Sequence, residues 1–309
     1  MAGPDDVTGA AALLAPAAPT VRSALLLGQN HATLRETATV GLPLHADGTD
    51  HGGGDAAELG AALSAGWLPK AVPSVEPNED GALLAAGPGG LLLAVADGHG
   101  GSAAAAAALR ALAGAATDLL AAPAAGSGGR DRHGGARLVR EFAAAAVEGV
   151  AAVAEPARTA LGLALVADGS IFSVSYGDTL TALVRWGRPR VIGAPSEFLG
   201  PGTHGGQDQG RPVERRRHRP GDTIVIVSDG VPDYLGRVFP DAVRAVLRSG
   251  GRAVSDASAV ARDLVAAAGA AGAGDNITAA VLLGTARPPW RVRPRRRCPP
   301  PQARTAPPE

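Results

Sequence analysis

Four aspartates share one local setting, because each stands where an apolar run meets a turn or a glycine. They are Asp97 (Leu-Ala-Val-Ala-Asp-Gly-His-Gly-Gly), Asp178 (Val-Ser-Tyr-Gly-Asp-Thr), Asp229 (Ile-Val-Ile-Val-Ser-Asp-Gly) and Asp275 (Gly-Ala-Gly-Asp-Asn-Ile-Thr). Carboxylates at strand ends can converge on one edge of a β sandwich, where their mutual repulsion requires a cation. Oxygen ligands of this kind select hard divalent ions such as Mg²⁺ or Mn²⁺. The pattern therefore indicates a metal site.

A plainer interpretation stands beside this one. An acidic residue next to glycine at the end of a strand is usually a turn residue. His99, two positions after Asp97, could likewise be a turn histidine. No Cys/His spacing supports a structural zinc site, and we expect His31, His45 and His51 to be solvated surface residues. Spacing alone leaves the metal site and the isolated turns both open.

Apolar runs bounded by glycine and proline predict the elements that hold these side chains. Gly87-Pro88-Gly89-Gly90 predicts a hairpin, and Ser102 is expected to cap the alanine-rich helix that follows. Short turns between residues 159 and 186 predict a three-stranded antiparallel meander. We expect strands over 21–29, 82–86, 91–96, 159–166, 171–176, 180–186, 223–227 and 277–283, and helices over 56–65, 102–125, 136–153, 241–247 and 256–268. This order predicts an α+β sandwich rather than a doubly wound parallel fold.

Composition narrows the class of protein further. Lys+Arg and Asp+Glu balance at 29 each, so nothing in the charge indicates nucleic acid or a membrane surface as a partner. Cys298 is the single cysteine, which fits a reducing cytoplasm. The first twenty residues lack a basic segment typical of a signal peptide. Arg110 and Asp118 interrupt the alanine-rich run, which argues against a membrane span. We expect a cytoplasmic protein.

Five short motifs follow one another along the chain. They are Asn78-Glu79-Asp80-Gly81, Asp97-Gly98-His99-Gly100-Gly101, Gly177-Asp178-Thr179, Ser-Asp-Gly-x-x-Asp from Ser228 to Asp233, and Asp275-Asn276-Ile277-Thr278. In this order they resemble the motifs of the metal-dependent type-2C serine/threonine protein phosphatase (PPM) family. The second is identical to the family's signature. The resemblance implies a four-layer α-β-β-α sandwich of two antiparallel sheets flanked by helices.

The resemblance also implies a site for two Mn²⁺ or Mg²⁺ ions and a looser third one. Asp97 would bridge two ions, the carbonyl of Gly98 would serve one of them, and Asp229 and Asp275 would hold the other. Asp178 would help to bind the third ion together with Asp229. These are expectations carried over from the family's motifs.

The remaining acidic residues and the histidine would complete the chemistry. Glu79 and Asp80 would bind metal-bound waters or a metal directly, and Glu79 is expected to take part in catalysis. His99 would be the general acid that protonates the leaving serine or threonine oxygen. The implied activity is hydrolysis of phosphoserine and phosphothreonine in proteins by a metal-activated water, without a phosphoenzyme. The substrates would be phosphorylated by a serine/threonine kinase, and we expect a monomer.

Some positions depart from the family pattern. The family has a phosphate-gripping arginine three residues before the Asn of Asn-Glu-Asp, where this chain has Val75. Lys70 or an arginine elsewhere could replace it. Thr179-Leu180 stands where the family has Ser-Arg. Val75 motivates an alternative, a pseudophosphatase that binds phosphoproteins without turnover. A third hypothesis keeps the enzyme but takes regulators of sigma factors as its substrates.

Composition along the chain suggests three segments. We expect a flexible N-terminus over 1–20, the phosphatase catalytic domain over 21–285 and a disordered Pro/Arg-rich tail over 286–309. Arg215-Arg216-Arg217 could bind a phosphopeptide, but a solvated charged strand or loop is the simpler interpretation.

Overall fold

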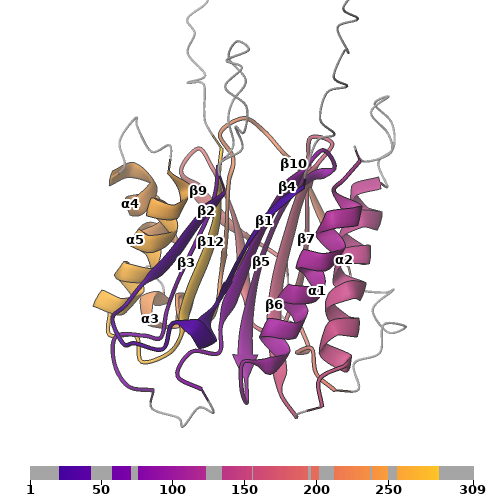
Figure 1. Ribbon diagram of the computed structural model, residues 1–309. Helices are drawn as coiled ribbons and strands as arrows, with labels where there is room; N and C mark the ends of the chain where they lie inside the picture. Colours follow the sequence, from indigo (N-terminus) through magenta and orange to yellow (C-terminus); the bar gives the residue numbers. More distant parts are fainter. Residues whose placement is uncertain are drawn as a thin grey trace, which may run out of the picture.

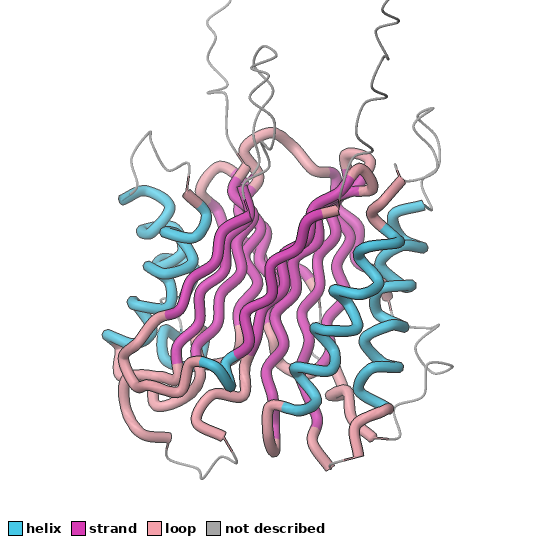
Figure 2. The backbone as a smooth tube through the Cα atoms, in the orientation of Figure 1, coloured by secondary structure: helices cyan, strands magenta, loops and turns pink. Residues whose placement is uncertain are grey.

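Two six-stranded antiparallel sheets pack face to face, and helices cover both outer faces (Figure 1; Figure 2). The computed structural model describes residues 21–42, 58–70, 76–122, 134–154, 156–193, 196–201, 212–236, 239–249 and 256–284. The first sheet contains, in spatial order, β1 (Arg22–Leu27), β4 (Gly81–Gly87), β5 (Gly90–His99), β6 (Arg158–Ala167), β7 (Ser170–Tyr176) and β10 (Glu214–Arg217). The second contains β2 (Ala38–Leu42), β3 (Glu58–Ser64), β12 (Ile277–Leu283), β11 (Thr223–Val227), β8 (Leu180–Arg185) and β9 (Arg188–Ile192).

The helices form the two outer layers. The long helices α1 (Ala103–Leu119) and α2 (Gly134–Ala151) cover the first sheet. The second sheet is covered by α5 (Ala257–Ala270) and α4 (Phe239–Ser249), with the short α3 (Pro232–Leu235) at one end. A 3-10 turn (Gly28–Asn30) follows β1. The predicted four-layer α-β-β-α sandwich is confirmed.

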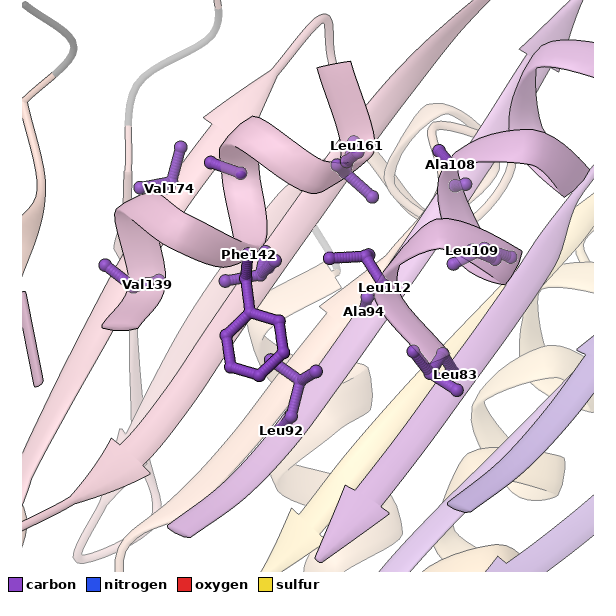
Figure 3. Close-up of a cluster of buried hydrophobic side chains, with 14 of the residues drawn as sticks. Leu83, Leu92, Ala94, Ala108, Leu109, Leu112, Val139, Phe142, Leu161 and Val174 are labelled. Carbon is purple, nitrogen blue, oxygen red and sulfur yellow. The ribbon is translucent and has the colours of Figure 1, made fainter. Parts of the chain in front are cut away.

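Buried side chains fill all three spaces between the layers. Along β5, Leu92 and Ala94 face α1 and α2, whereas Leu93 and Val95 face the second sheet. Figure 3 shows the helix-facing cluster around Phe142. Because both faces of each central strand are buried, these strands are continuous apolar runs rather than alternating ones. Each fully buried leucine stabilises the fold by roughly 1.5–3 kcal/mol.

The helix expected over 56–65 is wrong, because this segment contains β3. Leucine and alanine favour a helix locally, but β3 pairs along its length with both β2 and β12. Its small residues also let α5 approach closely. A Cβ on Gly60 would lie 2.1 Å from the backbone nitrogen of Ser258 at the start of α5. Packing between sheet and helix therefore overrides the local preference.

The meander expected over 159–186 is only partly correct. β6 and β7 form a hairpin, but β8 pairs with β9 and β11 in the other sheet. The chain crosses between the sheets at Gly177, whose φ of 66° is a conformation that glycine adopts without strain. Asp178 therefore lies in a crossover between the sheets instead of a hairpin turn. Strands β2 and β9 were not anticipated, and β10 is the charged strand considered for Arg215–Arg217.

The cap expected from Ser102 is also wrong. Ser102 occupies the position before α1, but its side chain does not cap the helix. Its hydroxyl donates to Gln29 Oε1 at 3.0 Å, and its backbone N–H donates to Glu76 Oε2 at 3.1 Å. Ser102 therefore ties the start of α1 to the turn after β1 and to the segment before β4.

Several expectations fall outside the described residues. These are the flexible segment 1–20, the tail 286–309, the loop around His45 and His51, and the position of Val75. Within the described residues, no helix combines the length and the apolar character needed to cross a membrane.

Candidate metal centre

The first sheet brings Asp80 and Asp97 side by side. Gly81 is opposite Ala96 across the β4–β5 pair, so one step further along places Asp80 opposite Asp97. Side chains alternate along a strand, so Asp97 lies on the same face of β5 as Val95, between the two sheets. Both carboxylates are buried, with exposed fractions of 2% for Asp80 and 7% for Asp97.

The second sheet contributes Asp229, just beyond the end of β11, and Asp275, just before β12. These strands are neighbours, and their pairing continues past the ladder because Ser228 N–H donates to the Thr278 carbonyl at 3.1 Å. Thr278 N–H in turn donates to Ser228 Oγ at 3.0 Å. The two acidic residues are thereby placed at the same end of adjacent strands.

Thr278 and Asn276 join the two sheets at this edge. Thr278 Oγ1 donates to Asp80 Oδ2 at 2.7 Å. Asn276 Oδ1 accepts from Glu79 N–H at 2.9 Å, and Asn276 Nδ2 donates to the Pro77 carbonyl at 2.8 Å. Both residues belong to the last of the five motifs, whose resemblance implies a role for Asp275 alone. Polar residues next to Asp275, at the start of an otherwise apolar strand, are the sequence signal that could identify them.

The carboxylates destabilise one another's charged forms. Burial raises the pKa of Asp97 well above its usual value, and the charges of Asp80 and Asp229 raise it further. Burial raises the pKa of Asp80 to about 7, although the Thr278 hydroxyl partly offsets this. Burial and the charge of Asp275 raise the pKa of Asp229. Residues from both sheets therefore converge on one small volume of negative charge.

Several carboxylate oxygens in this volume have no protein partner. They are Asp80 Oδ1, Asp97 Oδ2 and Asp178 Oδ1, all buried and without a hydrogen bond. A buried polar atom that is left unsatisfied costs roughly 1–3 kcal/mol, and more when it is charged. A hard divalent cation would satisfy these oxygens and neutralise the repulsion. The donor set therefore fits Mg²⁺ or Mn²⁺.

His99 lies at the opening of this cluster. His99, Asp178 and Asp229 each place a potential ligand atom within 4.8 Å of the others. His99 Nδ1 is 3.7 Å from Asp97 Oδ1, and the ring packs edge-on against Phe198 with centroids 4.7 Å apart. Asp178 reaches this point because the chain crosses from the first sheet to the second at Gly177, where the sequence predicts a hairpin turn.

The remaining predicted site residues surround the cluster. Lys70 Nζ lies 3.2 Å from Asp275 Oδ1. Glu79 Oε1 accepts from Glu76 N–H at 3.2 Å. Gly98 packs so tightly that a Cβ there would lie 2.6 Å from the Glu79 carbonyl oxygen, so only glycine lets the chain pass. That the Gly98 carbonyl ligates a metal stays a prediction.

An α-β-β-α sandwich with a carboxylate centre between its antiparallel sheets is the architecture expected for a metal-dependent phosphatase. The family model described as protein phosphatase 2C matches residues 72–265. The chain therefore belongs to the protein phosphatase 2C family, the metal-dependent serine/threonine phosphatases, which use Mn²⁺ or Mg²⁺.

Solved structures show the same fold. The Mycobacterium tuberculosis serine/threonine phosphatase PstP/Ppp matches with a TM-score of 0.53 and 22% identity, over 74% of this chain and 99% of that one. The PstP catalytic domain in complex with two manganese ions matches with a TM-score of 0.52 and 19% identity, over 84% and 99%. A point mutant of a bacterial serine phosphatase matches with a TM-score of 0.56 and 18% identity, over 75% and 100%. No curated protein sequence matches the chain.

Proposed function

We propose that this chain hydrolyses phosphoserine and phosphothreonine in proteins with a water activated by two divalent cations. The observation that carries the proposal is the convergence of carboxylates from both sheets and from the crossover between them, with three buried oxygens, those of Asp80, Asp97 and Asp178, left unsatisfied. Cations held there would lower the pKa of a bound water and neutralise the phosphoryl oxygens.

The chain's own residues divide into ligands and supports. Asp97 would serve as a ligand of both ions, because it lies between Asp80 on the first sheet and Asp229 from the second. Asp275 would be a further ligand of the two paired ions, and Asp178 with Asp229 would hold a third ion. Gly98 would contribute its carbonyl.

Proton delivery falls to His99. Its Nδ1 faces the carbonyl and carboxylate oxygens of Asp97, at 3.4 and 3.7 Å, so Nε2 is the nitrogen left to meet a substrate. In this role His99 donates a proton to the oxygen of the leaving serine or threonine. Phe198 packs against the ring and limits its rotation.

Glu79 and Asp80 take their positions from groups of the other sheet. The Thr278 hydroxyl holds one oxygen of Asp80 and turns the other into the cluster. Asn276 fixes the backbone of Glu79, whose carboxylate would orient a water at the site. Asn276 and Thr278 would thus be positioning residues rather than ligands.

The wider setting completes the proposal. The described strands and helices lie between Arg22 and Leu283, which supports a single catalytic domain over 21–285 flanked by the segments 1–20 and 286–309. We propose that the protein acts as a cytoplasmic monomer on substrates of a serine/threonine kinase. The single cysteine and the balanced charge support this setting.

A metal-titrated assay on a phosphoserine or phosphothreonine peptide tests the function. Phosphate release should require Mn²⁺ or Mg²⁺ and stop on chelation. Folded, metal-loaded protein that releases no phosphate would contradict the proposal. If it binds the phosphopeptide without turnover, the pseudophosphatase alternative replaces it.

A further inference from the structure

The chain lacks the family's phosphate-gripping arginine, because Val75 occupies its position. Lys70, the replacement that the sequence suggests most directly, is already engaged with Asp275 at 3.2 Å. A phosphate monoester held by metal ions would have further oxygens that need hydrogen-bond donors. A guanidinium can donate to two of these oxygens at once. Another basic side chain near the metal centre could bind these oxygens.

The backbone of Arg158 lies next to the proposed metal centre. It opens β6 directly opposite His99 on β5, just as Ala160 is opposite Asp97. Residues opposite one another in an antiparallel pair project to the same face of the sheet, so Arg158 shares the face of Asp97 and His99. Two residues along a strand span about 7 Å, a distance that an extended arginine side chain covers. Arg158 therefore stands one step outside the carboxylates, beside the proposed general acid.

An aromatic ring holds the guanidinium next to His99. Arg158 Cζ lies 4.9 Å from the centroid of Phe198, the same ring that packs against the His99 imidazole. The backbone of the next residue, Leu199, exchanges hydrogen bonds of 2.7 and 2.9 Å with Thr159. Since Phe198 is tied to β6 in this way, the three side chains form one contiguous group at the opening.

Among the described residues, no carboxylate pairs with Arg158. Arg185, for comparison, donates two hydrogen bonds to the buried carboxylate of Asp222. In the described part of the chain, Arg158 makes no ion pair, and its side chain is exposed to solvent. An exposed arginine that lies against an aromatic face keeps its N–H groups available for an anion.

We propose that Arg158 binds the phosphate of the substrate, in place of the arginine that the family has at the position of Val75. The guanidinium donates to phosphoryl oxygens that do not face the metals, while Phe198 and His99 limit its movement. This inference rests on the proposed function, because it assigns a substrate contact to the same site.

Steady-state kinetics of Arg158→Ala, Arg158→Lys and the control Arg110→Ala test the inference. Arg110 is an exposed arginine on α1, away from the centre. Loss of a bidentate charged contact should raise KM for a phosphopeptide about 10- to 100-fold, with a smaller change in kcat. Inhibition by inorganic phosphate should weaken by a similar factor. Arg158→Lys should recover part of both effects, because it keeps the charge but loses the fork.

Binding of Mn²⁺, measured by calorimetry, separates this contact from a structural role. It should be the same in wild type and all three variants. If Arg158→Ala matches Arg110→Ala in KM and in phosphate inhibition, the inference is wrong although the phosphatase stands. It is equally wrong if Arg158→Ala weakens Mn²⁺ binding, or if Lys70→Ala alone weakens phosphate inhibition. A wild-type protein without metal-dependent turnover would instead remove the proposed function itself.

Discussion

Asp229 is a proposed metal ligand whose charge opposes folding of the metal-free protein. Burial and the charge of Asp275 raise its pKa, so at neutral pH its ionised form destabilises the metal-free fold. Asp229→Asn keeps the shape and removes the charge. We expect a metal-free protein with a higher melting temperature, a smaller shift on adding Mn²⁺, and a phosphatase rate reduced at least ~100-fold. Calorimetry and the peptide assay measure all three quantities.

Asp222 provides the matched control for that substitution. It is fully buried, whereas Asp229 is partly buried, and it accepts two hydrogen bonds from Arg185, at 2.8 and 2.7 Å, and one from Arg219 N–H at 2.8 Å. Asp222→Asn should therefore destabilise the protein by roughly 1–3 kcal/mol and leave Mn²⁺ binding intact. Equal effects of the two substitutions would remove the special role of Asp229.

The role of His99 as a general acid should be visible in how the reaction rate depends on the leaving group. A general acid matters most when the leaving oxygen is a poor one, as in serine or threonine, and least for a phenolate. We expect His99→Gln to reduce kcat for a phosphopeptide about 10²- to 10⁴-fold, and para-nitrophenyl phosphate hydrolysis far less. Asp229→Asn serves for comparison, since the loss of a proposed metal ligand should slow the hydrolysis of both substrates alike. Equal losses on the two substrates for His99→Gln would contradict the role of a general acid.

Two glycines separate helix propensity from helix packing. Gly114 in α1 has open space around the position of a Cβ, whereas a Cβ on Gly149 in α2 would lie 2.7 Å from Ala111 Cβ and 2.9 Å from the Ala107 carbonyl oxygen. Gly114→Ala should stabilise the protein by about 0.5–1 kcal/mol. Gly149→Ala should destabilise it by about 1–3 kcal/mol, because it pushes α1 and α2 apart. Chemical denaturation distinguishes the two, and a stabilising Gly149→Ala would show that the helices are not in close contact.

Strands with turn residues at both ends could be predicted from the sequence, and those made of alanine and leucine could not. The hairpin of β4 and β5 and the closing strand β12 follow from local runs and glycines. The sequence predicts a helix where β3 lies, because the pairing of β3 with β2 and β12 involves residues far away in the chain. The crossover at Gly177 could not be predicted for the same reason, since a short turn does not indicate which sheet the next strand joins.

The candidate site shows the same division. The motifs identified Asp80, Asp97 and Asp229 as acidic residues at strand ends, and the topology of both sheets was needed to bring them together. Arg158 belongs to no motif. Its place beside His99 depends on the register between β5 and β6, which only the folded sheet defines.

The sandwich as a whole is held at one edge by groups whose charge depends on pH. The pKa of Asp80 is about 7 in the fold and 3.8 as its ordinary value, so unfolding releases a proton between these limits. The stability that this residue contributes is fully present below about pH 4, falls as the pH rises, and is lost above about pH 7. Asp80→Asn should therefore match wild type near pH ~3.5, and near pH ~7.5 it should exceed the metal-free wild type by a few kcal/mol, an order-of-magnitude figure.

Metal should reverse that order, because the proposed cations would lie between Asp80 on the first sheet and Asp229 and Asp275 on the second and would stabilise the ionised form. With saturating Mn²⁺ at the higher pH, wild type should gain RT ln(1 + [L]/Kd) for each ion, about 2.7 kcal/mol at a hundredfold excess over Kd, and Asp80→Asn should gain less. Thermal melts of both proteins at the two pH values, with Mn²⁺ and with a chelator, measure the comparison. A metal-free difference that is the same at both pH values would mean that Asp80 is not strained by its burial. A Mn²⁺ shift that Asp80→Asn retains in full would mean that the ions do not join the two sheets through this residue.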